Sequence, residues 1–242
     1  MASFDDPATR RERLRDARLM LLFTPSLCGT RGGNDARDPL SSRDALDVLD
    51  AALPHVDVVQ VRIKAPGEPS HARDVHDWTE RVLALVAARP TSRERVLVIV
   101  DDCVDVAAVL AARGCAGVHV GQDDLPAEEV RRLLDAQLLV GVSTHDMQQV
   151  ALAEDAGADY LGFGPVHATA TKGYERGLGA EAAWIAQSAT PLPVFPIGGI
   201  ALENANELAQ IGRAAVSSAI LGAADPARAA RELRELLADD DG

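Results

Sequence analysis

Short apolar runs alternate with amphipathic stretches along the chain from residue 19 onward. The runs are rich in Val, Leu and Ile and lack the strict polar alternation of a strand with one solvated face, so they are typical of parallel strands buried on both faces. The predicted strands are LMLLF (19–23), DVVQV (57–61), VLVIV (96–100), AGVHV (116–120), LLVGV (138–142), DYLGF (159–163), PVFPI (193–197) and RAAVS (213–217).

Helix-like segments follow these runs in regular alternation. They lie near 43–53, 74–88, 104–113, 127–134, 146–155, 180–188, 203–210 and 226–237. Eight strand–helix units of this spacing favour a closed α/β barrel, the (β/α)8 TIM barrel, over a doubly wound sheet. The length of 242 residues is close to the roughly 250 typical of that fold. We therefore expect one catalytic barrel domain over 16–242, preceded by a charged extension over 1–15 that is either a ragged terminus or an extra helix.

Composition and charge narrow the function classes. Apolar residues make up 47% of the chain, the formal net charge is −13, and no polybasic run occurs. Nucleic acids and anionic membranes both require clustered Lys and Arg, so neither is an expected partner. We expect neither a signal peptide nor a membrane span, because the N-terminal region is charged and no apolar run reaches about 18 residues. We expect a cytoplasmic protein with small-molecule substrates. The pattern leaves its oligomeric state open, a homo-oligomer included.

An acidic protein must capture an anionic ligand with a few well-placed cations. Gln60, Arg62 and Lys64 follow the second predicted strand and alternate toward the same side, which in a barrel can be the inside. Two cations at the barrel rim would suit a phosphate or diphosphate, since Arg binds it with two parallel hydrogen bonds and Lys as a point charge. The alternative is a pair of cationic side chains that extends along the surface.

Carboxylates stand at the ends of the third and fourth predicted strands. Asp101 and Asp102 follow the third, and Asp124 follows the fourth within GQDDLP. Carboxylates from neighbouring strand ends suit Mg²⁺, which prefers one or two of them together with water and phosphate oxygens. Alternatively, Asp102 and Asp124 cap the helices that follow. Their occurrence together with Arg62 and Lys64 favours the metal–diphosphate interpretation.

The later strand ends carry hydroxyls, glycines and one further cation. Ser143 could donate its hydroxyl to a phosphate or cap the helix at 146–155, and His145 could titrate in the site or only pack. The loop over 162–172 brings two threonines and Lys172 together after a glycine, which suits phosphate oxygens, although an exposed turn would look similar. Gly198 and Gly199 permit backbone N–H groups to approach an anion, or a tight turn. The long loop over 25–42 has the composition of an active-site lid or a disordered segment.

These segments, in this order, resemble the thiamine phosphate synthase family. The matching motifs are QVRIK, VDD, GVHVGQDDLP, GVSTH, GADYLGFGPVHATATK, PIGGI and SSAI, over about residues 57–222. The combination of GQDD with GPV and TxTK is specific, whereas IGGI alone is common to many phosphate-binding barrels. The resemblance implies that hydroxymethylpyrimidine diphosphate and a thiazole phosphate are joined to thiamine phosphate with release of pyrophosphate. It implies a Mg²⁺-dependent, dissociative reaction without a protein nucleophile.

The resemblance also implies roles for individual residues. Arg62, Lys64, Ser143 and Lys172 are the expected catalytic residues. The pyrimidine diphosphate would be held by Gln60, Arg62, Lys64, Ser143 and Lys172. Mg²⁺ would be bound by Asp102 and Asp124. The thiazole phosphate would be held by Thr169, Thr171, Gly199, Ser217 and Ser218.

The chain departs from the family pattern at several positions. Asp101 stands at a substrate-binding position where the family usually has Asn, and it adds negative charge beside the diphosphate. Ser217 replaces a usually apolar residue, and the acidic residue after the first strand is missing. Two rival functions follow. The related thiazole tautomerase, an isomerase, shares the barrel and a Ser-x-His motif that Ser143 and His145 match. A non-catalytic paralogue that binds thiamine phosphates would be consistent with Asp101.

Overall fold

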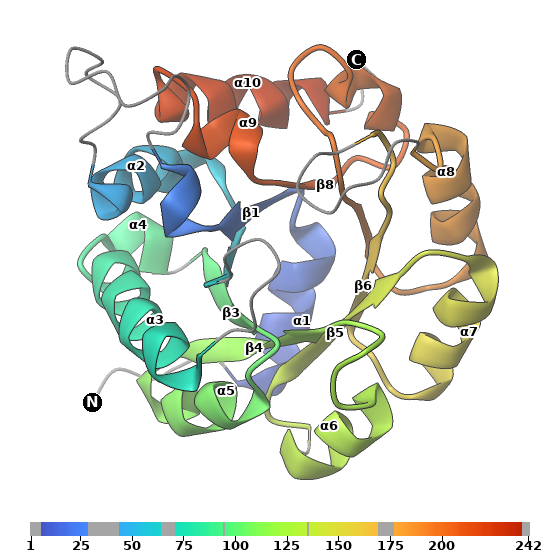
Figure 1. Cartoon of the computed structure of the whole chain (residues 1–242), viewed down its shortest axis with the longest axis horizontal. Helices are drawn as coiled ribbons and strands as arrows, with labels where there is room; N and C mark the ends of the chain where they lie inside the picture. The colour runs from blue at the N-terminus through green and yellow to red at the C-terminus, as the bar shows by residue number, and fades with distance from the viewer. Residues whose placement is uncertain are drawn as a thin grey trace.

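Eight parallel strands form the centre of the molecule (Figure 1), as the sequence predicts. The computed structural model describes residues 6–28, 44–63, 71–93, 95–134, 136–168 and 177–238. The strands are β1 (Leu19–Phe23), β2 (Val58–Val61), β3 (Leu97–Asp101), β4 (Cys115–Val120), β5 (Leu139–Thr144), β6 (Tyr160–Phe163), β7 (Val194–Pro196) and β8 (Ala214–Val216). They pair in the order β7-β6-β5-β4-β3-β2-β1-β8.

The sheet closes on itself, which makes it a barrel. β1 pairs with both β2 and β8, and a bridge between Ile197 and Ala215 joins the end of β7 to β8. The predicted (β/α)8 fold is therefore confirmed. Because all strands run in the same direction, their carboxyl ends meet at one mouth of the barrel, where enzymes of this fold carry their chemistry.

Helices surround the strands (Figure 1). They are α1 (Pro7–Asp16), α2 (Ala45–Ala52), α3 (Ala72–Ala87), α4 (Pro90–Arg93), α5 (Val104–Leu110), α6 (Ala127–Leu134), α7 (Met147–Asp155), α8 (Ala180–Ala189), α9 (Ser218–Leu221) and α10 (Pro226–Leu236). Short 3₁₀ turns occur at η1 (Pro25–Leu27), η2 (Leu53–His55), η3 (Ala111–Arg113) and η5 (Ala205–Leu208). In the described part of the chain, no helix is both long and apolar enough to span a membrane.

The predicted helix over 203–210 is wrong in type, because the segment forms only the single 3₁₀ turn η5. The side chain of Asn204 accepts a hydrogen bond from the N–H of Ala201 at 2.9 Å and donates one to the carbonyl of Gly199 at 2.9 Å. Such local side-chain bonds offer the backbone an alternative to an α-helix. Gly212, at φ 73°, then turns the chain toward β8.

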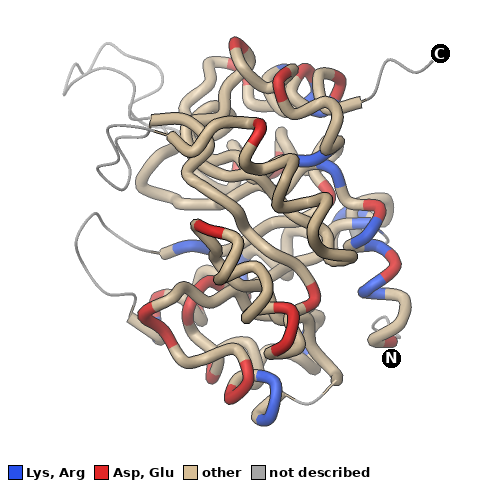
Figure 2. The backbone as a smooth tube through the Cα atoms, turned by 90° about the vertical axis from the view of Figure 1, so that its right-hand side faces the viewer, with Lys and Arg blue, Asp and Glu red and all other residues tan. Residues whose placement is uncertain are grey.

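The strands separate two apolar regions. Residues that point outward, such as Val59 and Val140, pack against the surrounding helices. Residues that point inward form a second cluster with Met20, Leu97 and Phe195. Charged residues lie mainly on the outer helices and loops (Figure 2). The strands are buried on both faces, which explains why their sequences are almost continuously apolar.

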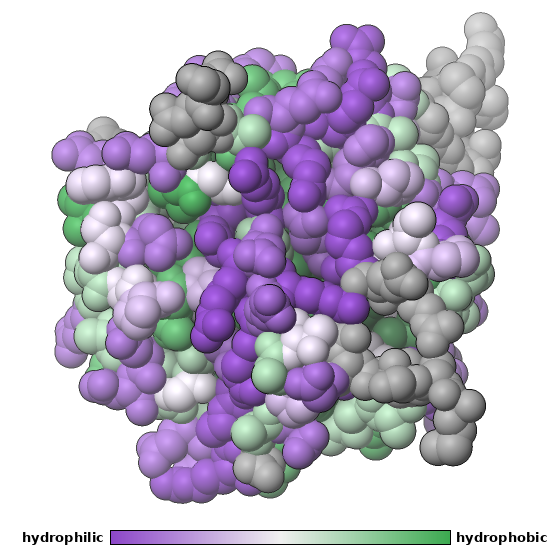
Figure 3. Space-filling view, turned by 180° about the vertical axis from the view of Figure 1, so that it is seen from behind, coloured by the Kyte–Doolittle hydropathy of each residue, from purple (hydrophilic) through white to green (hydrophobic). Residues whose placement is uncertain are grey.

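Helix α1 covers the amino-terminal end of the barrel. Leu14 and Ala17 are 1% and 2% exposed and belong to the inner apolar cluster. Two arginines add polar contacts: the buried Arg10 donates to the carbonyl of Gln137 at 2.7 Å, and the partly exposed Arg11 pairs with Asp159 at 2.7 Å. α1 lies behind the strands in Figure 1, and Figure 3, seen from that side, shows a band of hydrophilic residues across this face. The opposite mouth is thus left for ligands.

A buried carboxylate ties this closed end together. Asp57, 6% exposed, accepts hydrogen bonds from the guanidinium groups of Arg95 and Arg234 at 2.8 and 2.5 Å. It also accepts the backbone N–H groups of Arg18 and Leu19 at 2.9 and 3.1 Å. One side chain thereby joins the start of β1, the start of β2 and α10.

We predict that Asp57→Asn lowers the free energy of unfolding by about 3 kcal/mol, because it leaves two partly buried guanidinium groups without their carboxylate. Asp50→Asn is the matched control, since it breaks only the outer ion pair with Arg89 and should cost less than about 1 kcal/mol. Urea unfolding followed by circular dichroism measures both. Equal losses in the two variants would contradict this role for Asp57.

Candidate active site

A cavity opens at the carboxyl ends of the strands. Its lining comes from the ends of strands on both sides of the barrel, so it lies across the mouth. It is lined by Leu22, Thr24, Leu27, Arg62, Ser143, His145, Gly162, Gly164, Pro165 and residues 197–200 and 215–218. Of the predicted site residues, Arg62, Ser143, Gly199, Ser217 and Ser218 share this cavity.

Arg62 supplies positive charge to one wall. Its backbone N–H donates to the carbonyl of Phe23 at 2.9 Å, which keeps it in line with β2. Its Nε lies 3.4 Å from Oδ2 of Asp101, whose side chain is 10% exposed. Gln60 lies two residues earlier, is 3% exposed, and its Nε2 has no hydrogen-bond partner within the described residues. The predicted inward alternation of Gln60 and Arg62 is thus present, while Lys64 lies outside the described residues.

Ser143 belongs to β5 and does not cap the following helix. Asp146 is the N-cap of α7, and its carboxylate accepts the N–H of Gln149 at 2.8 Å. Ser143 instead directs its hydroxyl inward, 2.9 Å from Nε2 of His119. His145, two residues on, places Nδ1 2.5 Å from the carbonyl of Gly164. The capping interpretation of Ser143 is therefore wrong.

Asp102 and Asp124 stand at the ends of β3 and β4, but neither lines the cavity. Asp102 has a left-handed backbone, φ 61°, and its N–H donates to the carbonyl of His119 at 2.8 Å. It does not cap α5, whose N-cap is Cys103. The carboxylate of Asp124 accepts the N–H of Gly121 at 2.7 Å.

Negative charge gathers beside Cys103. The pKa of its thiol is raised to about 11, first by burial and then by the carboxylates of four neighbouring aspartates. These are Asp105, Asp102, Asp101 and Asp124, in decreasing order of effect. Asp101, Asp102 and Asp124 are therefore all near enough to raise the pKa of one thiol, and carboxylates at neighbouring strand ends suit a divalent cation. The high pKa keeps Cys103 protonated at neutral pH and unsuited to nucleophilic chemistry.

The opposite wall is built from glycines and hydroxyls. Gly198 and Gly199 have φ of 96° and 65°, and a Cβ on Gly199 would lie 2.6 Å from the carbonyl oxygen of Ala168. Ser217 donates its hydroxyl to the carbonyl of Leu22 at 2.9 Å, and Ser218 is exposed at the start of α9. Only glycine fits the Gly199 turn, which leaves backbone close to the cavity. Thr169, Thr171 and Lys172 lie outside the described residues.

The site also contains polar residues to which the sequence motifs assign no role. Thr24 lines the cavity, is 4% exposed, and its hydroxyl has no partner in the described part of the chain. His119 and Tyr160 lie beneath Ser143 inside the barrel. Alternation along β4 and β6 was the available signal for the latter two, since it turns both side chains inward. A buried polar atom without a partner is costly, so Thr24 and Gln60 are suited to contact a ligand.

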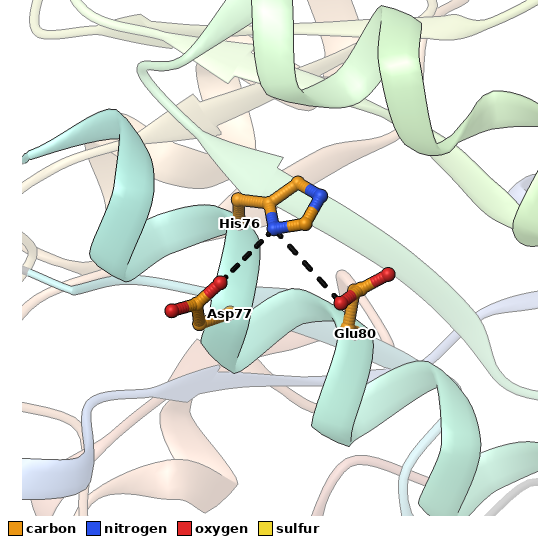
Figure 4. A group of neighbouring side chains, drawn as sticks. All are labelled: His76, Asp77 and Glu80. Atoms are coloured by element: carbon orange, nitrogen blue, oxygen red, sulfur yellow. Dashed lines mark hydrogen bonds and ion pairs between the residues drawn. The ribbon is translucent and has the colours of Figure 1, made fainter.

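A second group of metal-type ligands lies away from the cavity. His76, Asp77 and Glu80 project together from α3 (Figure 4). The Nδ1 of His76 is 3.1 Å from the carboxylate of Asp77, and Glu80 also pairs with Arg113. Partly or fully exposed side chains that pair with one another in this way do not indicate a metal centre, and none of them lines the cavity.

Comparison with known proteins agrees with this geometry. The family model for thiamine monophosphate synthase matches residues 34–220. A thiamine-phosphate synthase of Prochlorococcus marinus (strain MIT 9313) is 38% identical over 231 residues, which is 94% of this chain and 59% of the relative. One of Anaeromyxobacter dehalogenans is 43% identical over 182 residues, 73% of this chain and 75% of the relative. The chain thus spans 59% of the length of the cyanobacterial relative.

Solved structures give the same result. Thiamine phosphate pyrophosphorylase from Pyrococcus furiosus superposes with a TM-score of 0.72 and 28% identity, over 94% of this chain and 96% of that one. 3-Hexulose-6-phosphate synthase from Salmonella typhimurium, at a TM-score of 0.59 and 20% identity, covers 91% of this chain and 98% of its own, and shares the fold. The family model matches most of the sequence, and the strand-end motifs converge at one mouth. The chain belongs to the thiamine monophosphate synthase family.

Proposed function

We propose that this chain joins hydroxymethylpyrimidine diphosphate to a thiazole phosphate and releases pyrophosphate. The carrying observation is that one cavity is lined by Arg62 and Ser143, at the ends of β2 and β5, and also by the Gly199 turn with Ser217 and Ser218, after β7 and β8. Two separate anion-binding groups across one cavity fit two phosphorylated substrates. Relatives at 35–43% identity carry the name thiamine-phosphate synthase, which supports the same assignment.

The proposed reaction transfers the pyrimidine-methyl group. The carbon–oxygen bond to the diphosphate breaks, and its electron pair leaves with pyrophosphate. The thiazole nitrogen then donates its lone pair to the pyrimidine-methyl cation and forms the new carbon–nitrogen bond. No proton transfer or protein nucleophile is needed. The protein must stabilise the departing negative charge and hold the two substrates in line.

Arg62 is the described cation placed for the first task, since it lines the same cavity as Ser143. Gln60 and Thr24 would each gain a hydrogen-bond partner from a bound substrate. Lys64 and Lys172 are proposed to add positive charge, and Thr169 and Thr171 to bind the thiazole phosphate. The backbone at Gly199 and the hydroxyl of Ser218 would complete that second site, together with the Ser217 hydroxyl once it turns from the carbonyl of Leu22 to the phosphate.

Asp102 and Asp124 are proposed to hold Mg²⁺. Two carboxylates at neighbouring strand ends, beside a third on Asp101, are the donor set that this ion prefers together with water and phosphate oxygens. When bound, the ion supplies positive charge to the diphosphate oxygens. Asp102 is held in place by its own backbone bond to His119, and Asp124 by its bond to Gly121.

The decisive experiment incubates the pure chain with both substrates and Mg²⁺ and measures thiamine phosphate and pyrophosphate. Formation of both in equal amounts supports the synthase, and absence of both contradicts it. Ser143 and His145 line the same cavity, so isomerisation of a thiazole phosphate by itself would instead support the tautomerase. Tight binding without turnover would support a non-catalytic paralogue.

We predict that Asp124→Asn lowers kcat by at least about 10²-fold, because the leaving diphosphate loses charge compensation. Added Mg²⁺ should restore part of the rate by mass action. Asp123→Asn is the matched control, since Asp123 is the neighbouring exposed carboxylate and should leave kcat unchanged. Similar rates for both variants would disprove the metal role of Asp124.

Substitution of Asp101 is expected to improve substrate binding, in contrast to the loss of activity expected on substitution of Asp124. Its carboxylate pairs with Arg62 and adds negative charge where the diphosphate would bind. Asp101→Asn should therefore lower KM for the pyrimidine diphosphate by about three- to tenfold and make KM rise more steeply with salt, because Arg62 then attracts the diphosphate without a compensating carboxylate. Steady-state kinetics at two ionic strengths measures this. A higher KM would mean that Asp101 helps binding by orienting Arg62, contrary to the prediction.

A further inference from the structure

Three side chains form a hydrogen-bonded chain from the barrel interior to the cavity. The hydroxyl of Tyr160 on β6 lies 3.1 Å from Nδ1 of His119 on β4. The Nε2 of the same ring lies 2.9 Å from the hydroxyl of Ser143 on β5. Tyr160 is completely buried, His119 is 7% exposed, and Ser143 lines the cavity. The chain therefore links the core to the site.

Two glycines leave the space that this chain occupies. A Cβ on Gly141 would lie 2.1 Å from Cζ of Tyr160, closer than atoms can approach. A Cβ on Gly162 would lie 3.2 Å from Cε1 of His119. Phe195 packs edge-on against the tyrosine ring at 5.8 Å between centroids. The rings are thus fixed on several sides, and their hydrogen bonds have little freedom to rearrange.

The direction of the bonds follows from Tyr160. Burial, followed by the charges of Asp101 and Asp159, raises the pKa of its phenol well above the usual value, so the group keeps its proton. Within the described residues, Nδ1 of His119 is the one hydrogen-bond partner of this hydroxyl. A buried O–H without an acceptor is costly. The phenol therefore donates to Nδ1, which must lack a proton.

We infer that Tyr160 holds His119 in the tautomer protonated at Nε2, so that His119 donates to Ser143 and Ser143 turns its own O–H toward the cavity. Ser143 is then a hydrogen-bond donor for a phosphate oxygen, and His119 and Tyr160 are its positioning residues. The assignment of that oxygen to the pyrimidine diphosphate rests on the proposed function, whereas the tautomer of His119 does not depend on it.

The opposite arrangement would have a different chemical consequence. If Nε2 lacked a proton, it would accept the proton of Ser143, as in the Ser–His pairs that activate a nucleophile. With Nε2 already protonated, His119 has no lone pair there to receive it. Ser143 therefore binds and does not attack, which agrees with a reaction that needs no protein nucleophile.

The tautomer can be measured directly. The full chain is labelled with ¹⁵N-histidine, and the signal of His119 among the six histidines is assigned by its loss in His119→Gln. We expect a protonated Nε2 and an unprotonated Nδ1 in the wild type, and loss of the Nδ1 hydrogen bond in Tyr160→Phe. A protonated Nδ1 in the wild type would overturn the inference, whether or not any ligand binds.

A double-mutant cycle tests the link to binding, with pyrophosphate and Mg²⁺ as the titrated probe. Ser143→Ala should weaken binding by about tenfold or more, because it removes a hydrogen bond to a charged group. Tyr160→Phe should weaken it by several-fold alone and by little in the Ser143→Ala background. The matched control is Phe195→Leu, which disturbs the packing around Tyr160 without removing any of the hydrogen-bonding groups and should add its effect independently.

Additive effects of Tyr160→Phe and Ser143→Ala would overturn the positioning role, as would an unchanged affinity in Tyr160→Phe. The outcome is distinguishable from that of the synthase assay. If no thiamine phosphate forms but His119 has the expected tautomer and the double-mutant cycle shows coupling, the proposed function is contradicted and this inference stands. Normal synthesis of thiamine phosphate by a protein whose His119 is protonated at Nδ1 would overturn this inference and leave the proposed function intact.

Discussion

Closure of the parallel sheet is the constraint on which the rest of the molecule depends. The strands are parallel, so all of them end at the same mouth. The bridge between Ile197 and Ala215 joins β7 to β8, and this closure makes neighbours of residues that are far apart in the sequence. The other mouth is sealed from inside by Leu14 of α1 and by Ala17, which follows the helix, and at its edge by the Asp57 ion pairs. The cavity is consequently confined to one end of the barrel.

The barrel interior changes character along its axis. Toward α1 it is apolar, with Met20, Leu97 and Phe195 in contact. Toward the cavity the inward positions become polar, and Gln60 and Thr24 keep buried atoms without partners among the described residues. A protein tolerates such atoms where a ligand supplies the missing bonds. These buried polar atoms lower the stability of the fold, but they lie where a bound ligand can form the missing hydrogen bonds, as in a preorganised site.

The distribution of charge also differs between the cavity and the outer surface. The chain carries a net charge of −13, yet Arg62 lines the cavity, with its Nε 3.4 Å from Oδ2 of Asp101. A few cations in a partly enclosed space act more strongly than the diffuse negative charge of the outer surface, because the local dielectric constant is lower. The carboxylates near Cys103 extend this arrangement with negative charge at the neighbouring strand ends, where a divalent cation would balance it.

The sequence by itself determined the eight strands, their parallel direction and the inward side of Gln60 and Arg62, because apolar runs and period-two alternation are local properties of the chain. It could not decide between capping and a role in the site for Ser143, since the alternative partner, His119, comes from another strand. The turn at 205–208, the orphaned hydroxyl of Thr24 and the contact of Tyr160 with His119 were likewise decided by the tertiary structure. Closure of the sheet determines which inward-pointing side chains meet, and no local sequence pattern encodes the distances between side chains on different strands.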